Sequence, residues 1–400
     1  MTAVNKGVHF GTDGWRGIIA ADYTVENVRR AADALARTFP PKRGTRPTVY
    51  VGYDHRFLAE NFAYTAADVL RQRGFQAKPL SEAVSSPFIS YLTNRRKCPF
   101  GVMITASHNP AHYLGFKVKA SYGGSISEET AKRIESNVRQ HEAAAASFSD
   151  SAEIYDPRSE FETYFKYLKS HVDVRFFKKA GLHAVVDSMY GPGGKFVERF
   201  LRTIPNRLNV KIIHNSRDAH FGGLHPEPIE PYLGGLKSEV KKSRAAFGFA
   251  LDGDADRLGA VDEHGRYLTP HQIFAMLLYY LVTVKKLRGK VVQALSLGYL
   301  SERIARDHGL PFEEVSVGFK YVAEKLMTDD VLIGGEESGG FAFGKTRSDT
   351  QRGSILPERD GVLSMLMFLE MRLATGKSIS SFLAEIQSKY GRSCYQRKDV

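Results

Sequence analysis

The chain has 400 residues, of which 42% are hydrophobic and 25% are charged. This composition is typical of a globular protein and excludes a disordered, collagen-like or fibrous chain. Lys and Arg number 56 against 44 Asp and Glu, and the resulting formal net charge of +12 favours anionic partners. The two cysteines, Cys98 and Cys394, stand far apart and have no Cys or His at metal spacing. We therefore expect no disulfide framework, no zinc site and a reducing compartment.

Signals for export, membrane insertion and nucleic-acid binding are weak. Residues 1–10 lack the cationic region and apolar run of a secretory signal. The longest apolar stretch, residues 273–284, is too short to cross a bilayer. The sequence shows no clustered basic helix or stacking-aromatic motif. We expect a cytoplasmic protein with neither a membrane nor a nucleic-acid partner.

Helical and strand periods alternate from the start of the chain. Thr24 is a good N-cap for a helix over residues 25–35, and residues 48–52 follow as a buried strand. The next predicted elements are a helix at 58–73, a strand at 75–80, a helix at 87–96 and a strand at 100–105. A charged, Ala-rich helix then ends near residues 141–146, and residues 147–157 form a linker.

The same alternation restarts after the linker. The further predicted strands cover residues 182–186, 210–213, 247–251, 290–295, 312–315 and 331–334. The further predicted helices cover residues 193–202, 233–244, 270–287, 299–308, 320–327, 360–375 and 378–390. Strands separated by helices of this length imply crossover connections and mostly parallel sheets.

We predict the α/β class, with three consecutive mixed or mostly parallel α/β domains around a central cleft. The first domain would span residues 1–150, the second 151–268 and the third 269–390, and residues 391–400 would open a truncated fourth domain. In each of the three domains one apolar strand ends in a short polar loop. These loops cover residues 105–110, 252–257 and 335–340. Ligands of open α/β sheets bind at the carboxyl ends of strands, so the three loops are the candidate site.

The second loop has the pattern of a metal site. Asp252, Asp254 and Asp256 stand at i, i+2 and i+4 directly after an apolar strand. Three converging carboxylates repel one another unless a hard divalent cation neutralises them, and Mg²⁺ is the natural choice. A solvated acidic turn is the alternative, which the strand context and the adjoining Arg257 make less favourable. An EF-hand is excluded, because the residues that follow supply no further ligands.

The first loop holds a serine beside a histidine. Ser107 follows a buried strand, and His108 is its neighbour. The loop lacks the Gly-x-Ser-x-Gly turn, so an acyl-transfer nucleophile is disfavoured, and a serine that caps a turn is the ordinary alternative. His108 and His112 have the spacing of a helical metal pair, but Pro110 prevents a regular helix between them.

The third loop suits recognition of sugar hydroxyls. Glu336 and Ser338 lie between glycines that include Gly335, and carboxylates and hydroxyls can pair with groups that both donate and accept. Residues 339–346 also satisfy the Walker A spelling. A P-loop must lead into a helix, whereas residues 347–357 are polar and broken by Gly and Pro, so a P-loop NTPase is the weaker alternative.

Together and in this order, the motifs resemble those of the α-D-phosphohexomutase superfamily, which includes phosphoglucomutase, phosphomannomutase and phosphoglucosamine mutase. Residues 11–17, GTDGWRG, resemble its N-terminal signature. The loops at 105–110, 252–257 and 335–340 resemble its phosphoserine, metal and sugar loops. The resemblance covers essentially the whole chain and implies an intramolecular phosphotransferase.

The resemblance also implies roles for individual residues. Ser107 would carry the phosphoryl group and, with the three aspartates, bind one Mg²⁺ per chain. Glu336 and Ser338 would bind the sugar, with Gly335 beside them. The cations implied around the transferring group are Arg16, Lys117, Arg257 and Lys320. Either Lys117 or His108 would serve as general acid and base.

The implied reaction interconverts hexose 1-phosphate and hexose 6-phosphate through phospho-Ser107 and a hexose 1,6-bisphosphate intermediate, which also acts as activator. The Glu-Glu-Ser stretch at 336–338, and Gly340 where mannose/glucose enzymes carry His, favour glucose. Phosphomannomutase and phosphoglucosamine mutase are the alternatives within the superfamily, and a P-loop NTPase or a non-catalytic basic binding protein are those outside it. We expect a monomer or homodimer. Residues 393–400 resemble the opening strand of the superfamily's C-terminal phosphate-binding domain, so we expect most of that domain to be missing and turnover to suffer through weak substrate binding.

Overall fold

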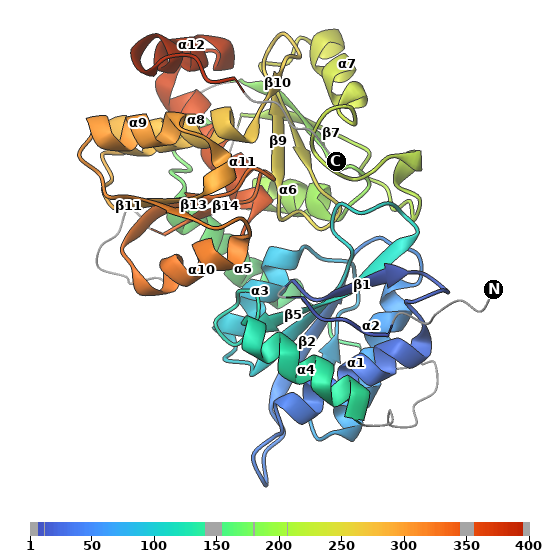
Figure 1. The fold of residues 1–400 in the computed structure, drawn as a ribbon. Coiled ribbons are helices and arrows are strands. Elements are labelled where there is room, and N and C mark those ends of the chain that lie inside the picture. Colours follow the sequence, from blue (N-terminus) through green and yellow to red (C-terminus); the bar gives the residue numbers. More distant parts are fainter. Residues whose placement is uncertain are drawn as a thin grey trace, which may run out of the picture. The chain divides into compact units, whose positions relative to one another are not determined.

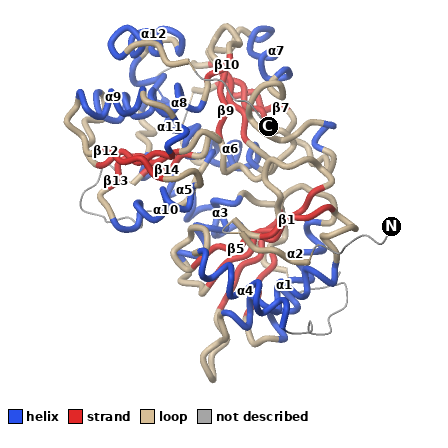
Figure 2. The backbone as a smooth tube through the Cα atoms, in the orientation of Figure 1, coloured by secondary structure: helices blue, strands red, loops and turns tan. Residues whose placement is uncertain are grey.

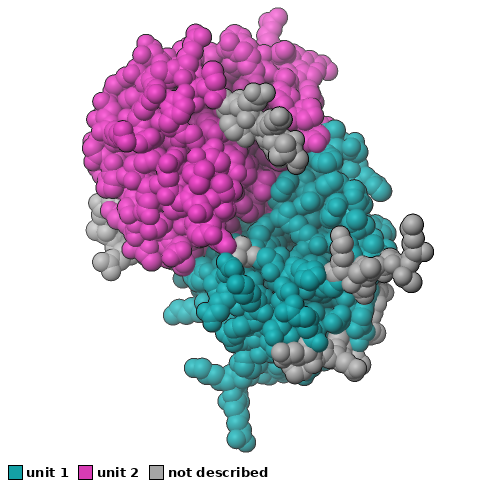
Figure 3. Space-filling view, viewed as in Figure 1, with its two compact units in different colours: residues 1–164, 190–192, 216–226 teal, residues 165–189, 193–215, 227–400 magenta. Residues whose placement is uncertain are grey.

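The computed structural model describes residues 7–11, 13–140, 154–178, 181–205, 207–344 and 356–394. These residues form alternating helices and strands that build three sheets (Figures 1 and 2). By their internal contacts they divide into two compact units, which Figure 3 colours separately. Unit 1 comprises residues 1–164, 190–192 and 216–226, and unit 2 comprises residues 165–189, 193–215 and 227–400.

The sheet of unit 1 has the strand order β1-β5-β4-β2-β3. β2 (Thr48–Tyr53) runs parallel to β3 (Gln76–Pro79) and to β4 (Phe100–Ile104). β5 (Tyr113–Ala120) returns antiparallel to β4 and pairs on its other side with β1 (Trp15–Ile18). The sheet is therefore mixed, with a parallel centre and an antiparallel edge.

Helices cover both faces of this sheet. α1 (Val25–Thr38) begins at the predicted cap Thr24, whose side chain accepts a hydrogen bond from the Asn27 amide. Apolar side chains of α1, α2 (Ala59–Gln72) and α4 (Glu128–Gln140) share one buried core with β2, β4 and β5. Each of these helices and strands contributes residues to this core, which therefore holds the three helices against the sheet.

α3 (Ser86–Arg95) packs on the other face of the same sheet. A Cβ at Gly52 of β2 would lie 2.6 Å from the Ile89 side chain, and one at Gly101 of β4 would lie 2.1 Å from Thr93 Oγ1. These two glycines therefore allow α3 to approach the strands closely. Unit 1 also contains the first half of α5 (Arg158–His171), up to residue 164, and the Phe161 ring of this helix packs against Phe88.

Unit 2 contains two sheets, of which the first has the order β10-β9-β8-β6-β7. β6 (His183–Asp187) runs parallel to β7 (Asn209–Ile213) and β8 (Gly248–Leu251). β9 (Leu258–Val261) returns antiparallel to β8 and pairs with β10 (Tyr267–Leu268). This is the same arrangement of parallel centre and antiparallel edge as in unit 1.

The second sheet of unit 2 has the order β12-β11-β13-β14. β11 (Lys290–Ala294) runs parallel to β12 (Phe312–Val315) and β13 (Val331–Gly335), and β14 (Phe341–Phe343) returns antiparallel to β13. Besides the end of α5, from residue 165 on, unit 2 contains the α-helices α6 (Gly193–Arg202), α7 (Gly234–Ser243), α8 (Pro270–Thr283), α9 (Leu300–Asp307), α10 (Phe319–Thr328), α11 (Gly361–Thr375) and α12 (Ile379–Tyr390).

α11 joins the two sheets of unit 2. Phe368 on α11 packs edge-on against Phe247 and Phe249 beside the first sheet. Glu370, also on α11, accepts hydrogen bonds from Tyr280 (2.7 Å) and Lys285 (2.8 Å) at the end of α8. Because α11 is apolar on nearly every side, it is buried all round rather than amphipathic.

The structure confirms the predicted α/β class with mixed sheets. The three loops at 105–110, 252–257 and 335–340 share a feature that the sequence periods did not reveal. Each connects a parallel strand to an antiparallel return strand. Among the described residues, no helix is both long and apolar enough to cross a membrane. The predicted helix end at 141–146 and residues 395–400 of the predicted final strand lie outside the described residues.

Candidate active site

The Ser107 loop lies at the tip of the β4–β5 hairpin in unit 1. Ser107 is buried, and its φ of 52° places it in the left-handed region that non-glycine residues rarely adopt. Its amide donates to Thr105 Oγ1 (2.9 Å), which in turn donates to Asp54 Oδ2 (2.6 Å). His108 Nδ1 lies 3.5 Å from Ser107 Oγ. Strained backbone of this kind persists where the surroundings over-determine it and is common at active sites.

Arg56 holds this loop from behind. Its fully buried guanidinium donates hydrogen bonds to four backbone carbonyls and to the carboxylate of Asp54 (3.2 Å). The carbonyls are those of Ser107 (2.6 Å), Asn109 (2.7 Å), Pro110 (2.8 Å) and Tyr113 (3.0 Å). These five bonds use all five N–H donors of the side chain. Arg56 was not among the predicted site residues, although it lies three residues beyond the carboxyl end of β2.

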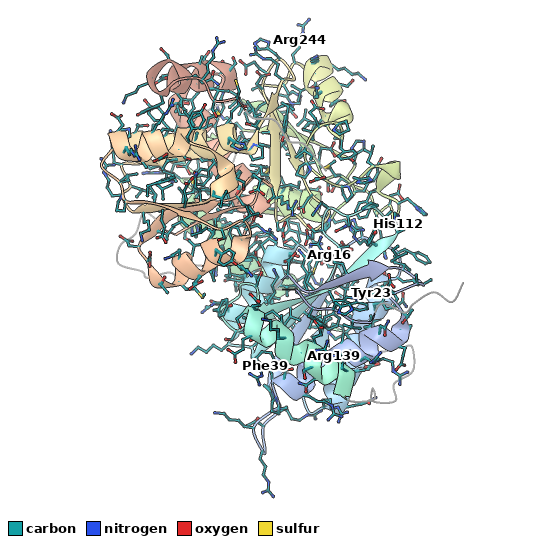
Figure 4. The ribbon with its side chains drawn as sticks, in the orientation of Figure 1. Arg16, Tyr23, Phe39, His112, Arg139 and Arg244 are labelled. Atoms are coloured by element: carbon teal, nitrogen blue, oxygen red, sulfur yellow. The ribbon has the colours of Figure 1, made fainter. Side chains whose placement is uncertain are left out.

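Two of the predicted cations reach one carboxylate beside the loop. Arg16 extends from β1 (Figure 4) and donates to Asn109 Oδ1 (2.5 Å) and to Asp13 Oδ2 (2.7 Å). Lys117 Nζ, on buried β5, lies 3.6 Å from the same Asp13 oxygen. Gly14 permits this close approach, since a Cβ there would lie 2.3 Å from the Phe116 carbonyl oxygen. The structure thus brings Arg16 and Lys117 together in unit 1.

The tip of the β8–β9 hairpin in unit 2 carries the predicted metal ligands. Asp252, Asp254 and Asp256 are fully buried, and one carboxylate oxygen of each lies within 4.8 Å of the others. Asp252 Oδ1 accepts hydrogen bonds from the amides of Asp256 (2.9 Å) and Arg257 (3.1 Å). Burial raises the pKa of Asp252 well above its usual range, and the charges of Asp256 and Asp254 raise it further.

These three carboxylates fit a hard divalent cation. Their donors are all oxygens, they are withdrawn from water, and their mutual repulsion destabilises the fully ionised state unless a positive charge lies between them. Within the described ranges, no other group of three His, Cys, Asp or Glu side chains converges in this way. Arg257 contributes a partly compensating charge, with Nε 3.8 Å from Asp256 Oδ1 and Nη1 4.0 Å from Glu227 Oε1.

The predicted sugar loop forms the β13–β14 connection in the same unit. Ser338 donates to Glu336 Oε1 (2.5 Å), so the two polar side chains already face each other. A Cβ at Gly335 would lie 2.7 Å from the Phe274 ring, so only glycine fits there. Lys320 lies in the first turn of α10, with Nζ 4.8 Å from the centre of the Tyr321 ring.

Arg359 connects the aspartate loop to the sugar loop. Its Nη2 lies 2.9 Å from Asp256 Oδ2, its Nη1 lies 2.7 Å from Glu336 Oε1, and its guanidinium lies over the Phe319 ring. The Leu258 amide also donates to the Gly339 carbonyl (2.9 Å). The structure therefore places the metal-type and sugar-type loops side by side within unit 2. Arg359 is a residue that the sequence analysis missed.

Models of known families match three stretches of the chain. They are phosphoglucomutase/phosphomannomutase alpha/beta/alpha domain I at residues 7–145, domain II at 162–265 and domain III at 269–390. The chain belongs to the phosphoglucomutase/phosphomannomutase family. The predicted resemblance to phosphohexomutases is thus confirmed over most of the sequence.

The names of similar proteins in this family refer to different sugars. A phosphoglucomutase/phosphomannomutase of Thermococcus kodakarensis is 31% identical over 383 residues, which cover 95% of this chain and 80% of the relative. A phosphoglucosamine mutase of Campylobacter jejuni is 30% identical over 394 residues, covering 94% and 82%. A crystal structure from Thermus thermophilus, assigned by name as a phosphomannomutase, is 36% identical with a TM-score of 0.88, covering 97% of this chain and 85% of that one.

The P-loop alternative is wrong for this family member. Residues 341–343, in the middle of the Walker A spelling, form strand β14 and pair antiparallel with β13. A P-loop needs an open backbone that leads into a helix, and a paired strand cannot cradle a phosphate in that way. Lys345 and Thr346, the last residues of the spelling, lie outside the described residues.

Proposed function

We propose that this phosphohexomutase interconverts hexose 1-phosphate and hexose 6-phosphate by phosphoryl transfer to and from Ser107. The observation that carries the proposal is the Ser107 loop itself. A buried hydroxyl at a strained backbone position is held by a dedicated arginine, with Arg16 bound to the next residue but one in the loop. A serine that only capped a turn would need none of these supports.

The cations of unit 1 suit the charge that develops during transfer. Phosphoryl transfer requires positioning and neutralisation of the equatorial phosphoryl oxygens more than covalent chemistry. Arg16 and Lys117 would bind these oxygens, with Asp13 keeping both side chains oriented. As a sugar hydroxyl oxygen bonds to phosphorus and the bond to Ser107 Oγ breaks, Lys117 or His108 would take the hydroxyl proton.

Asp252, Asp254 and Asp256 would hold Mg²⁺. The ion, when bound, supplies positive charge that polarises phosphoryl oxygens. Arg257 would take part in phosphoryl transfer beside these aspartates. The Ser107 phosphate would complete the set of Mg²⁺ ligands.

Glu336 and Ser338 would bind the sugar hydroxyls, and Lys320 would be one of the cations around the transferring group. We propose glucose as the sugar, with hexose 1,6-bisphosphate as intermediate and activator, and mannose or glucosamine phosphates as the alternatives within the family. Gly340 makes room for the Arg359 side chain, because a Cβ there would lie 2.2 Å from Arg359 Cδ. Any larger residue at this position would displace the arginine that orients Glu336.

Kinetic comparison of substrates tests the proposal. Turnover would be measured for the glucose, mannose and glucosamine 1-phosphates with Mg²⁺ and catalytic glucose 1,6-bisphosphate, for the wild type and for Ser107→Ala. We expect the highest kcat/KM for glucose 1-phosphate and loss of all turnover in Ser107→Ala with an unchanged circular dichroism spectrum. Turnover retained by Ser107→Ala would reject the phosphoserine, whereas a preference for another sugar would reject only the substrate.

A further inference from the structure

A segment far downstream of the serine loop belongs to unit 1. The chain leaves unit 2 after Asn215 and returns to it at Glu227, and the residues between, 216–226, cluster with unit 1 together with 190–192. We call residues 216–226 the anchor segment. At its centre, Phe221 is fully buried and has a φ of 52°.

The anchor segment is fixed to unit 1 at several points. Arg217 Nη1 lies 2.6 Å from Glu60 Oε2 on α2. His55 Nδ1 lies 2.6 Å from the Tyr190 carbonyl oxygen, and the Tyr190 ring lies so close to Gly222 that a Cβ there would come within 2.5 Å of it. These contacts hold the turn around Phe221 against the residues that follow β2.

The turn is also closed internally. Asp218 accepts hydrogen bonds from the amides of His220 (2.8 Å) and Gly222 (3.0 Å), and its carbonyl accepts one from the Phe221 amide (3.0 Å). The backbone conformation of Phe221 is therefore set by the segment itself. The Phe221 side chain is fully buried at this turn.

The ring of Phe221 covers the face of the Arg56 guanidinium, with Arg56 Cζ 4.8 Å from the ring centre. The edge of that guanidinium is saturated by the five hydrogen bonds to Asp54 and to the loop carbonyls, so its face is where a further contact can form. A cation over an aromatic face is attracted to it, more strongly when both are withdrawn from water. Phe221 thus completes the enclosure of the side chain that holds the Ser107 loop.

We propose that Phe221 is a positioning residue for phosphoryl transfer, acting on the Ser107 loop through Arg56. With the ring in place, Arg56 keeps one orientation, and its bonds to the carbonyls of Ser107 and Asn109 maintain the strained conformation that presents the serine. Without the ring, the guanidinium loses the aromatic contact on its face, its orientation is less restricted, and the loop gains alternative conformations. The inference rests on the proposed role of Ser107.

The test compares two buried phenylalanines of unit 1. Phe221→Leu removes the aromatic face but keeps an apolar side chain, and Phe221→Tyr keeps the face. Phe88→Leu is the matched control, because Phe88 is equally buried but packs on Phe161 and Tyr164. For each variant of the 400-residue chain, the thermal midpoint, kcat, KM and the rate at which glucose 1,6-bisphosphate phosphorylates Ser107 would be measured, the last by peptide mass spectrometry.

We expect Phe221→Leu to lower kcat and the rate of Ser107 phosphorylation by about tenfold to 100-fold with little change in KM, because a small misplacement of reacting atoms has effects of this size. Phe221→Tyr should restore most of both rates. Phe88→Leu should lower the thermal midpoint by a similar amount and leave both rates within about twofold of the wild type.

Equal effects of Phe221→Leu and Phe88→Leu on the two rates would overturn the proposal and leave Phe221 as ordinary core. If Phe221→Leu does not fold, Phe221→Met, which has a flexible side chain of similar volume and no ring, takes its place with the same expected loss and the same overturning result. A wild type whose Ser107 is never phosphorylated would instead contradict the proposed function. The failures of the two proposals are therefore distinguishable.

Discussion

Arg359 is predicted to contribute strongly to the stability of unit 2, because one side chain neutralises two buried carboxylates. Its nitrogens lie 2.9 Å from Asp256 Oδ2 and 2.7 Å from Glu336 Oε1, and the three side chains are 8%, 0% and 7% exposed. Arg359→Met keeps much of the apolar stem and removes the cation. Both carboxylates then remain buried with less positive charge near them, as does Glu358, whose Oε1 lies 3.9 Å from Arg359 Nε.

The size of the loss follows from the geometry. Two unit charges 4 Å apart interact by about 4 kcal/mol at an effective dielectric constant of 20. Removal of one partner from a buried ion pair costs about 3–5 kcal/mol. The substitution breaks the close pairs of Arg359 with Asp256 and with Glu336. Uptake of a proton by one of these carboxylates limits the loss of stability. We expect Arg359→Met to lower the free energy of unfolding of the metal-free protein by about 3–5 kcal/mol and the thermal midpoint by about 6–20 °C.

Thermal and urea unfolding followed by circular dichroism would measure this loss. Arg266→Met is the matched control, since Arg266 Nε lies 2.7 Å from Asp262 Oδ2 but its side chain is 64% exposed. The control should lose less than about 1 kcal/mol. Added Mg²⁺ should recover part of the loss in Arg359→Met, because the ion and the arginine neutralise the same carboxylates. A loss no larger than that of Arg266→Met would refute the reasoning.

Two further predictions concern the metal and pH. Asp254→Asn removes one anionic ligand, so the Mg²⁺ concentration for half-maximal activity should rise by about tenfold or more, and an unchanged Mg²⁺ titration would remove Asp254 from the ligand set. Burial lowers the pKa of His171 to about 4, against a hydrogen bond from its ring to the Tyr167 carbonyl that raises it. Because the unfolded chain binds the proton first as pH falls, the free energy of unfolding should decrease between about pH 6.5 and 4, by about 3 kcal/mol from this group. His171→Gln should flatten that part of the stability profile, and an unaltered profile would show that His171 does not cause it.

The crossover helices and the central parallel strands could be predicted from periodicity, because the helices are long and strands such as β4 and β8 are continuously apolar. Helix α6 was predicted with its observed bounds, and α1 with its observed cap. The antiparallel return strands could not be predicted in this way. β5 carries buried Lys117 and Lys119 within its apolar run, β9 has four residues and β14 has three. Such strands exist because a neighbouring strand supplies their hydrogen bonds, which a local pattern does not contain.

The candidate site could be predicted only in part, because a local pattern does not contain contacts between residues distant in the chain. Asp252, Asp254 and Asp256 are clustered in sequence and also in space, so their spacing was sufficient. Arg56, Arg359 and Phe221 act on residues distant in the chain, and no local pattern distinguishes them from other buried residues. Arg56 could have been found by applying the rule of strand ends to β2 as well as to β4. For Arg359 and Phe221 the decisive signal is the tertiary contact itself.

The most direct test of the account is the phosphorylation state of Ser107. Purified protein would be incubated with glucose 1,6-bisphosphate and Mg²⁺, the peptide that contains Ser107 quantified by mass spectrometry, and glucose 1-phosphate then added to the washed protein. We expect phosphate on Ser107 that is lost as glucose 1,6-bisphosphate appears. Phosphate that remains on Ser107 after addition of the sugar, or that is never found there, would contradict this expectation.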